Sequence, residues 1–192
     1  MWGQLISFDH SLLLAINGSG GAIMDQIMLL FSSKWIWIAM YAVLLWLIYR
    51  FKGLKGTILL VLFVGLLIIL SDQLSVQLFK NQFERLRPCH EHLLKESIDL
   101  VAGKCGGKFG FISSHASNTM ALSVFLFISM KDHWKNWSWL LIVWSVFVGI
   151  SRVYLGVHYP SDVIVGWFFG GVMAVFSAYG HKLVSSRLKS DD

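Results

Sequence analysis

The chain has 192 residues, of which 56% are hydrophobic, 15% aromatic and only 14% charged, with a formal net charge of +5. This length suits one domain, residues 1–192, and soluble domains carry roughly a quarter of charged residues. The basic residues are scattered between apolar runs, which excludes a continuous nucleic-acid-binding stripe. Nine Trp residues are typical of membrane–water interfaces. We therefore expect an integral membrane protein with the bilayer, not nucleic acid, as its partner.

The N-terminal segment, 1–33, lacks the basic start and long apolar stretch of a cleavable signal peptide. It contains two short apolar patches, Leu12–Ile16 and Ile27–Phe31, separated by a Gly-rich turn. Each patch is shorter than the roughly 20 residues that a transmembrane helix needs. We predict interfacial amphipathic helices here, with a re-entrant or partly buried helix pair as the alternative.

Five longer apolar runs predict five transmembrane helices, which together form a helical bundle over residues 35–180. The runs are Trp35–Tyr49, Gly56–Leu70, His115–Met130, Trp137–Tyr154 and Val163–Tyr179. The fifth run has a small residue at every fourth position, namely Gly166, Gly170, Ala174 and Ala178. Such a stripe lets helix backbones approach closely. We expect it to pack within the bundle, with dimerisation as the alternative.

Counting the spans places two polar connections, residues 81–114 and Ser151–Ser161, on one face of the membrane. Residues 50–55, residues 131–136 and the tail 182–192 share the other face. These three segments are basic through Arg50, Lys52, Lys55, Lys131, Lys135, Lys182, Arg187 and Lys189. Because short basic segments stay cytoplasmic, we expect a bacterial inner-membrane protein whose polar connections face the periplasm or its equivalent, with a cytoplasmic C-terminus.

Both cysteines, Cys89 and Cys105, lie in the connection over residues 81–114. An outside location permits a disulfide between them, which would stabilise the loop by about 3 kcal/mol on the chain-entropy model. Two unpaired thiols are the alternative.

The expected outer face carries three groups of polar residues, the first of which is Lys80, Arg87 and Pro88. The two cations are seven positions apart, so they can share one helical face, and Pro88 would end that helix. The alternative is a cationic helix end that reaches to lipid head groups.

The second group, Ser113, Ser114 and His115, directly precedes the third span. We expect Ser113 to be the N-cap, so that the free N–H groups of the helix start face a bound anion. His115 would then lie beside that anion. A capped helix with an uninvolved histidine is the alternative.

The third group is Ser151, Arg152, His158 and Asp162 in the string SRVYLGVHYPSD. Pro160 suits the first turn of the last span, and His158 and Asp162, four positions apart, can meet across that turn. A carboxylate that binds one ring nitrogen leaves the other free to attack as a nucleophile. A histidine held at a helix start for stability alone is the alternative.

Together, three cations, two histidines, a carboxylate and the two serines before His115 converge on one face. Charges in a bilayer protein are costly and indicate function. No acidic cluster with a divalent-metal pattern accompanies them. The residues therefore predict a phosphate site that works without a metal or another cofactor.

The three groups resemble the signatures of the type 2 phosphatidic acid phosphatase superfamily, K-x6-R-P, P-S-G-H and S-R-x5-H-x3-D. The first and third are present without departure. In the second, Ile112 replaces Pro and Ser114 replaces Gly, whereas Ser113 and His115 are kept. The resemblance covers about residues 35–180.

This resemblance implies an all-α bundle of six transmembrane helices, so we expect five to six here. It implies that the phosphate of a lipid is bound by Lys80, Arg87, Ser113, Ser114 and Arg152. His158 would form a phosphohistidine while Asp162 orients it, and His115 would protonate the leaving oxygen and then activate water.

An active site on the outer face suits a substrate whose tail stays in the bilayer. Among the family's substrates we rank undecaprenyl pyrophosphate first, ahead of the 1-phosphate of lipid A, phosphatidylglycerol phosphate and phosphatidic acid. A lipid phosphotransferase is the alternative within the family. A transporter or non-catalytic scaffold is the alternative outside it, but transporters have helices broken near the midplane. No obligate protein partner is evident.

Overall fold

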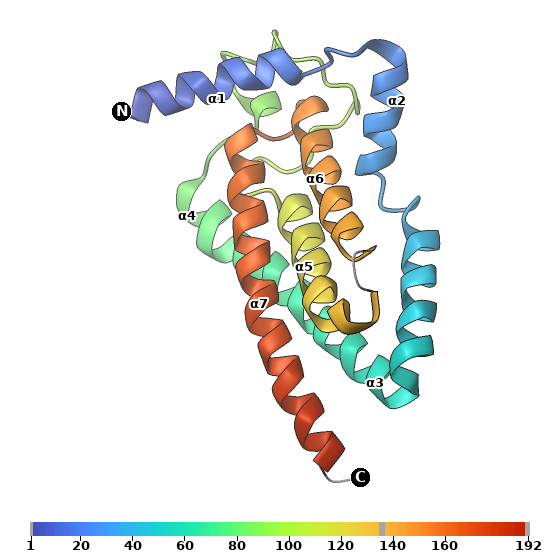
Figure 1. The fold of residues 1–192 in the computed structure, drawn as a ribbon. Coiled ribbons are helices and arrows are strands. Elements are labelled where there is room, and N and C mark those ends of the chain that lie inside the picture. The colour runs from blue at the N-terminus through green and yellow to red at the C-terminus, as the bar shows by residue number, and fades with distance from the viewer. Residues whose placement is uncertain (1, 135–136, 191–192) are drawn as a thin grey trace.

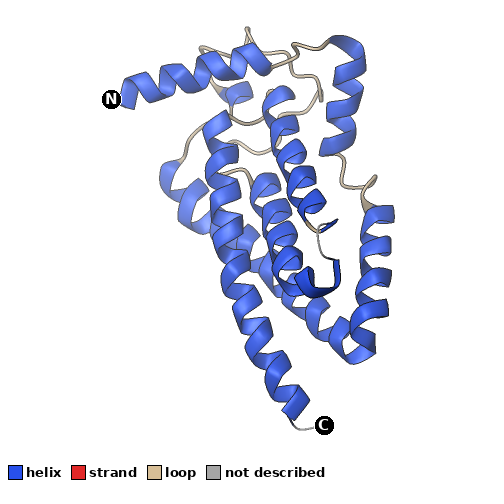
Figure 2. Cartoon of the chain, viewed as in Figure 1, coloured by secondary structure: helices blue, strands red, loops and turns tan. Residues whose placement is uncertain are grey.

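The computed structural model describes residues 2–134 and 137–190, and within these residues all regular structure is helical (Figure 2). The elements are α1 (Trp2–Ile16), α2 (Gly21–Ser32), α3 (Ile38–Leu74), the π-helical η1 (Ser75–Lys80), α4 (Asn81–Phe83), the 3-10 turn η2 (Pro88–His90), α5 (Ser114–Trp134), α6 (Trp139–Tyr154) and α7 (Pro160–Ser190). The predicted all-α class is confirmed. Lys135 and Asp192, which belong to the segments expected in the cytoplasm, lie outside the described residues.

Helix α3 contains two of the predicted spans. Gly53 has a φ of +66° and a ψ of −174°, a conformation that L side chains rarely adopt. The chain reverses direction there, so that the two parts of α3 form a hairpin (Figure 1). The basic residues 50–55 therefore lie at the same end of the bundle as the C-terminus of α7.

The small-residue stripe of α7 packs against α5. A Cβ atom added to Gly170 would lie 2.1 Å from the carbonyl oxygen of Ser117, and one added to Gly166 would lie 2.9 Å from the carbonyl oxygen of Ser113, the residue before α5. Ala174 and Ala178 are buried. Only small residues permit this approach, so the predicted packing within the bundle is confirmed.

The bundle has an apolar interior and an apolar outer surface. The largest buried cluster comprises Ile48, Leu60, Leu67, Ala121, Phe125, Leu126, Met130, Trp134, Leu141, Ala174 and Ala178. On the outside of α3, Leu62 and Ile69 are 64% and 62% exposed. Large apolar side chains exposed in this way are typical of a protein surrounded by lipid.

By length and hydropathy, two helical stretches could cross a membrane, Ile38–Phe83 and Pro160–Leu188. A third is added if Ile6–Ile16 and Gly21–Ser32, which are bent by 114° at their junction, are one span. The expected count of five to six spans therefore stays a prediction.

The two N-terminal helices differ in their surroundings. Helix α1 lies across the end of the bundle, as an interfacial helix would, whereas α2 runs beside α6 (Figure 1). Met28 of α2 is buried against Tyr154 and Leu155, and the ring of Phe31 stacks on that of Phe147 at 5.2 Å. Helix α2 thus corresponds to the partly buried alternative, because α6 offers it an apolar face.

Candidate active site

The three polar groups meet at the end of the bundle that α1 covers. His115 lies in the first turn of α5, Arg152 in the last turn of α6, and His158 in the connection that leads to α7. His115 is within electrostatic reach of His158 and of the cations Lys80, Arg87 and Arg152. Side chains from distant parts of the chain therefore surround one site.

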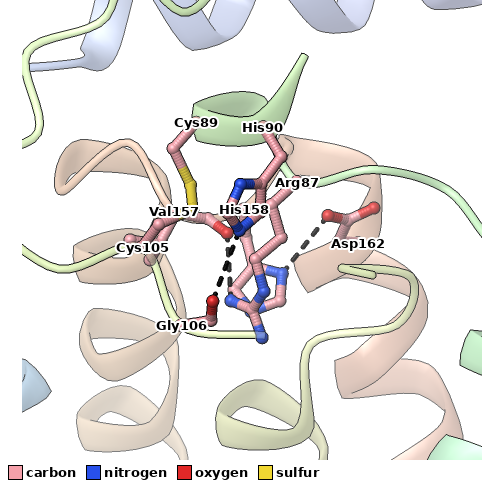
Figure 3. The surroundings of a disulfide bond; sticks show 8 residues. All are labelled: Arg87, Cys89, His90, Cys105, Gly106, Val157, His158 and Asp162. Atoms are coloured by element: carbon pink, nitrogen blue, oxygen red, sulfur yellow. Dashed lines mark hydrogen bonds and ion pairs between the residues drawn. A yellow bond between two sulfur atoms is a disulfide. The ribbon is translucent and has the colours of Figure 1, made fainter. Parts of the chain in front are cut away.

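His158 is held at both ring nitrogens (Figure 3). Its Nδ1 lies 3.2 Å from Oδ2 of Asp162, and its Nε2 lies 2.9 Å from Nη1 of Arg87. A guanidinium can only donate, so Nε2 accepts and Nδ1 carries the proton that Asp162 binds. Burial, together with the charges of Arg87, Arg152 and Lys80, lowers the pKa of His158 well below its usual value. The imidazole is therefore neutral, with its lone pair on Nε2.

The helix that carries Lys80 ends earlier than predicted. Residues Ser75–Lys80 form a π-helical turn, a feature that is frequent at functional sites. The helix stops three residues later because Glu84 adopts a left-handed φ of +46°. The prediction that Lys80 and Arg87 share one helical face, with Pro88 ending that helix, is therefore wrong.

Arg87 reaches the site from the loop instead. Its backbone N–H donates to the carbonyl oxygen of Lys108 over 3.0 Å, beside an isolated antiparallel bridge. A disulfide joins Cys89 to Cys105, so the expected pairing is present in the structure (Figure 3). Gly106 then lies against the guanidinium of Arg87, where an added Cβ would be 3.7 Å from Cζ. The closed loop thereby fixes the position of Arg87.

Two arginines of the site have unpaired donors. Nε of Arg87 and Nε of Arg152 are buried without a hydrogen-bond partner in the part of the chain that the structure describes. Leaving a buried donor unpaired costs about 1–3 kcal/mol. Guanidinium N–H groups pair well with the oxygens of a phosphate, often two at a time. Both residues therefore suit an oxyanion site, and the hydroxyl of Ser32 at the end of α2 holds Nη1 of Arg152.

The serines before His115 organise the start of α5. Nζ of Lys80 donates to Oγ of Ser114 over 2.7 Å, and Ser75 Oγ lies 3.0 Å from the same oxygen. Ser113 Oγ accepts from the N–H of Ala116 at 3.5 Å, as an N-cap does. Ser114 adopts the helical conformation in place of the family's Gly, so its hydroxyl is available to hold Lys80.

His115 is exposed and lines a cavity of about 230 Å³. The other walls are Phe31, Ser32, Ser33, Lys34, Trp37, Tyr41, Asp72, Ser114, Asn118, Thr119, Trp144 and Val148. Nδ2 of Asn118 lies 3.5 Å from Oδ1 of Asp72, and Oδ1 of Asn118 is buried with no hydrogen-bond partner among the described residues. An apolar cavity of about 430 Å³ shares four of these wall residues. A partly polar cavity beside His115 therefore adjoins an apolar one.

Three further residues of the site, Asp9, Arg85 and Ser161, were not predicted from the sequence. Nη1 of Arg85 lies 3.0 Å from Oδ1 of Asp162, and its Nη2 lies 2.5 Å from Oδ2 of Asp9. No motif marks these residues. The signal available in the sequence was Asp9 itself, the one acidic residue of α1, because charges in a membrane protein are costly and indicate function.

The arrangement can bind a tetrahedral anion between cations, with a neutral imidazole beside it and a second, exposed imidazole toward the cavity. Across residues 2–134 and 137–190, no group of three or more His, Cys, Asp and Glu side chains is arranged to hold a metal ion. The chemistry available to these side chains is nucleophilic attack with proton transfer.

Comparisons with known proteins agree with this chemistry. The model of the PAP2 superfamily matches residues 60–184. A lipid A 4'-phosphatase of Bacteroides thetaiotaomicron is 34% identical over 97% of this chain and 83% of its own length. An undecaprenyl-diphosphatase of Sulfolobus acidocaldarius is 28% identical over 91% of this chain and 79% of its own. The crystal structure of a PAP2-type phosphatidylglycerolphosphate phosphatase from Bacillus subtilis is similar in fold, with a TM-score of 0.65 and 22% identity over 93% of this chain and 86% of that one.

Proposed function

The chain belongs to the PAP2 superfamily of lipid phosphatases, and we propose that it hydrolyses a lipid phosphate through a phosphohistidine on His158. The observation that carries this proposal is the neutral imidazole held between Asp162 and Arg87, with Nε2 unprotonated. An imidazole in this state is ready to attack phosphorus.

In the first step, the phosphate oxygens accept hydrogen bonds from Lys80, Arg87 and Arg152. Nη1 of Arg87 thereby exchanges its hydrogen bond to Nε2 of His158 for one to the substrate. Nε2 then bonds to phosphorus while the bond from phosphorus to the lipid oxygen breaks. Asp162 stabilises the positive charge that develops on the ring. The negative charge of the bound phosphate favours the protonated form of His115, which lies on the side of the cavity and gives its proton to the departing oxygen.

In the second step, His115 is deprotonated and accepts a proton from water. The water oxygen bonds to phosphorus, the bond from phosphorus to Nε2 of His158 breaks, and inorganic phosphate leaves. His115 is then protonated and His158 neutral, as at the start. No step requires a metal ion, so we expect full activity in EDTA.

We propose lipid A carrying a 4'-phosphate as the substrate. Supporting this, the relative named for that activity is more similar to this chain than the relative named undecaprenyl-diphosphatase, at 34% against 28% identity. The comparisons therefore do not support undecaprenyl pyrophosphate, which the sequence analysis ranked first.

The cavity beside His115 supports a sugar as the leaving group. The carboxylate of Asp72 and the unpaired Oδ1 of Asn118 are acceptors, which suit the hydroxyl or N–H donors of a sugar ring. The adjoining apolar cavity suits an acyl chain.

We propose that the site faces outward, in the periplasm or its equivalent. A disulfide in the loop that carries Arg87 is typical of an oxidising compartment. The basic turn of α3 and the C-terminal end of α7 lie together at the opposite end of the bundle (Figure 1), which favours the cytoplasm for that end.

The test is phosphate release in detergent with EDTA from lipid A, undecaprenyl pyrophosphate, phosphatidic acid and phosphatidylglycerol phosphate. We expect lipid A to be hydrolysed with the highest kcat/KM, specifically at the 4'-position. A higher kcat/KM for another lipid would overturn the substrate, and a need for divalent metal would overturn the mechanism. Phosphate appearing on a second lipid instead of in solution would indicate a phosphotransferase.

The nucleophile is tested with His158→Ala, using His92→Ala as the matched control, because His92 is an exposed histidine outside the motifs. With labelled substrate, the wild type and the control should form an acid-labile phosphoprotein, and His158→Ala should form none. Turnover by His158→Ala at the wild-type rate would reject the nucleophile.

A further inference from the structure

A network of ion pairs and hydrogen bonds connects α1 to His158. Arg85 binds Asp162 through Nη1 at 3.0 Å and Asp9 through Nη2 at 2.5 Å. Ser161 joins the same group, since its Oγ accepts from Nη1 of Arg85 at 2.6 Å and donates to Oδ2 of Asp9 at 2.6 Å. The N–H of Ser161 donates to Oδ1 of Asp9 at 3.0 Å. One arginine therefore bridges two carboxylates, and a serine completes the bridge.

Asp162 is fully buried, and both of its oxygens are used. Oδ2 accepts from Nδ1 of His158 at 3.2 Å and from the N–H of Tyr159 at 3.1 Å, while Oδ1 accepts from Arg85. A buried carboxylate stays ionised only when charged or hydrogen-bonding partners compensate its lost hydration. Arg85 supplies both the charge and the bond that fixes the plane of this carboxylate.

Arg85 is itself held in place. Its guanidinium lies over the ring of Tyr159, with Cζ 3.9 Å from the centroid, and that ring stacks on His10 of α1 at 5.2 Å. Asp9 binds the second Nη group, so the guanidinium cannot rotate away from Asp162. Because Asp9 and His10 are neighbours in α1, the N-terminal helix forms one wall of the network.

We propose that Arg85 and Asp9 are positioning residues: they hold the carboxylate of Asp162 in the orientation that aims His158 at phosphorus. Helix α1 is thereby part of the catalytic apparatus and not only a contact with the membrane surface. This inference rests on the proposed role of His158 as the nucleophile. Neither residue belongs to the three sequence signatures, and Asp9 lies outside the segment that the family model matches.

The test separates kcat from KM in Asp9→Asn and Arg85→Gln. Neither residue contacts Lys80, Arg87 or Arg152, the cations proposed to bind the phosphate, so KM should stay within about twofold. In contrast, kcat should fall by about 10- to 100-fold, as for residues that orient a metal-binding side chain through a hydrogen bond. The rate of phosphohistidine formation in a single turnover should fall by the same factor. Asp9→Glu, which keeps the charge, should recover part of the rate.

The matched control is Asp25→Asn. Asp25 lies on α2 at the same end of the bundle and accepts a hydrogen bond from the hydroxyl of Tyr154 at 2.6 Å, outside the network. Its kcat should equal that of the wild type. Combining Asp9→Asn with Arg85→Gln should lower kcat little more than Arg85→Gln alone, because Asp9 acts through Arg85.

The outcomes are distinguishable. If Asp9→Asn and Arg85→Gln lose thermal stability while the folded protein keeps the wild-type kcat, the network only anchors α1 and the proposal is overturned. A rise in KM with unchanged kcat would also overturn it, by assigning Arg85 to substrate binding. Failure of the proposed function would appear separately, as full turnover by His158→Ala.

Discussion

The site end of the bundle and the apolar interior beneath it are held together by different interactions. At the site end, ion pairs of Arg85 join α1 to the start of α7, through Asp9 and Asp162. In the interior, α5 and α7 are joined by close backbone approach and apolar packing, as at Gly170 and Phe125. Directional contacts set the positions of reacting groups, whereas non-directional burial sets stability. Substitutions at the two places should therefore change different quantities.

The largest effect is expected at the site end, from Asp162→Asn. An amide can donate to Nδ1 of His158 and so favour the tautomer with its proton on the attacking nitrogen. By analogy with other orienting carboxylates, kcat should fall on the order of 10⁴-fold. Steady-state kinetics and thermal unfolding in detergent check this. A loss below tenfold in a correctly folded variant would show that Asp162 does not orient the nucleophile.

The disulfide tests whether stability and rate are linked at the site end. Replacing both Cys89 and Cys105 by Ser should lower the free energy of unfolding by about 3 kcal/mol and raise KM, because the loop that positions Arg87 is no longer closed. Chemical denaturation and kinetics measure the two effects. Reductant should lower the free energy of unfolding and raise KM in the wild type, and should change neither in the double variant. If reductant changes neither quantity in the wild type, the disulfide does not position Arg87.

In the interior, two adjacent glycines of α7 provide a matched pair. A Cβ on Gly170 would lie 2.1 Å from the carbonyl oxygen of Ser117, whereas one on Gly171 meets no atom of residues 2–134 or 137–190 within 4 Å. Gly170→Ala should therefore destabilise the fold by about 1–3 kcal/mol, and Gly171→Ala should not. The kcat of the folded fraction should be unchanged in both. Equal stability of the two variants would contradict the packing of α7 on α5.

The smallest effect concerns pH. Burial and nearby cations lower the pKa of His158, and the neutral form is the nucleophile. An unperturbed histidine is half protonated near pH 6.5, whereas His158 should remain neutral there and protonate only at lower pH. Titration of ¹⁵N-histidine-labelled protein by NMR, with His158→Ala for assignment, measures this. A midpoint at or above 6.5 would contradict the neutral nucleophile.

Several features of the site follow from short stretches of sequence. Pro160 begins α7 as predicted, Ser113 precedes α5 as an N-cap, and His158 meets Asp162 one helical turn away. Each depends on residues within four positions of one another, where helix geometry alone sets the distance. The small-residue stripe of α7 is likewise a periodic pattern, so its packing was predictable.

Other features depend on contacts between distant residues. The sequence predicted Lys80 and Arg87 on one helix, but Glu84 ends the helix, and pairing with the segment around Lys108 carries Arg87 to the site. Which of several short polar loops pair with one another is decided by tertiary structure, since local propensity favours many conformations nearly equally.

From its sequence alone, this chain is a helical membrane protein with the signatures of a lipid phosphatase, because composition, periodicity and spacing are properties of the chain itself. Tertiary structure decided that Arg85 bridges Asp9 and Asp162, which are 153 positions apart in the numbering. Such a bridge exists only when packing brings both carboxylates to one cation, since the energy of an ion pair depends on distance in space and not along the chain.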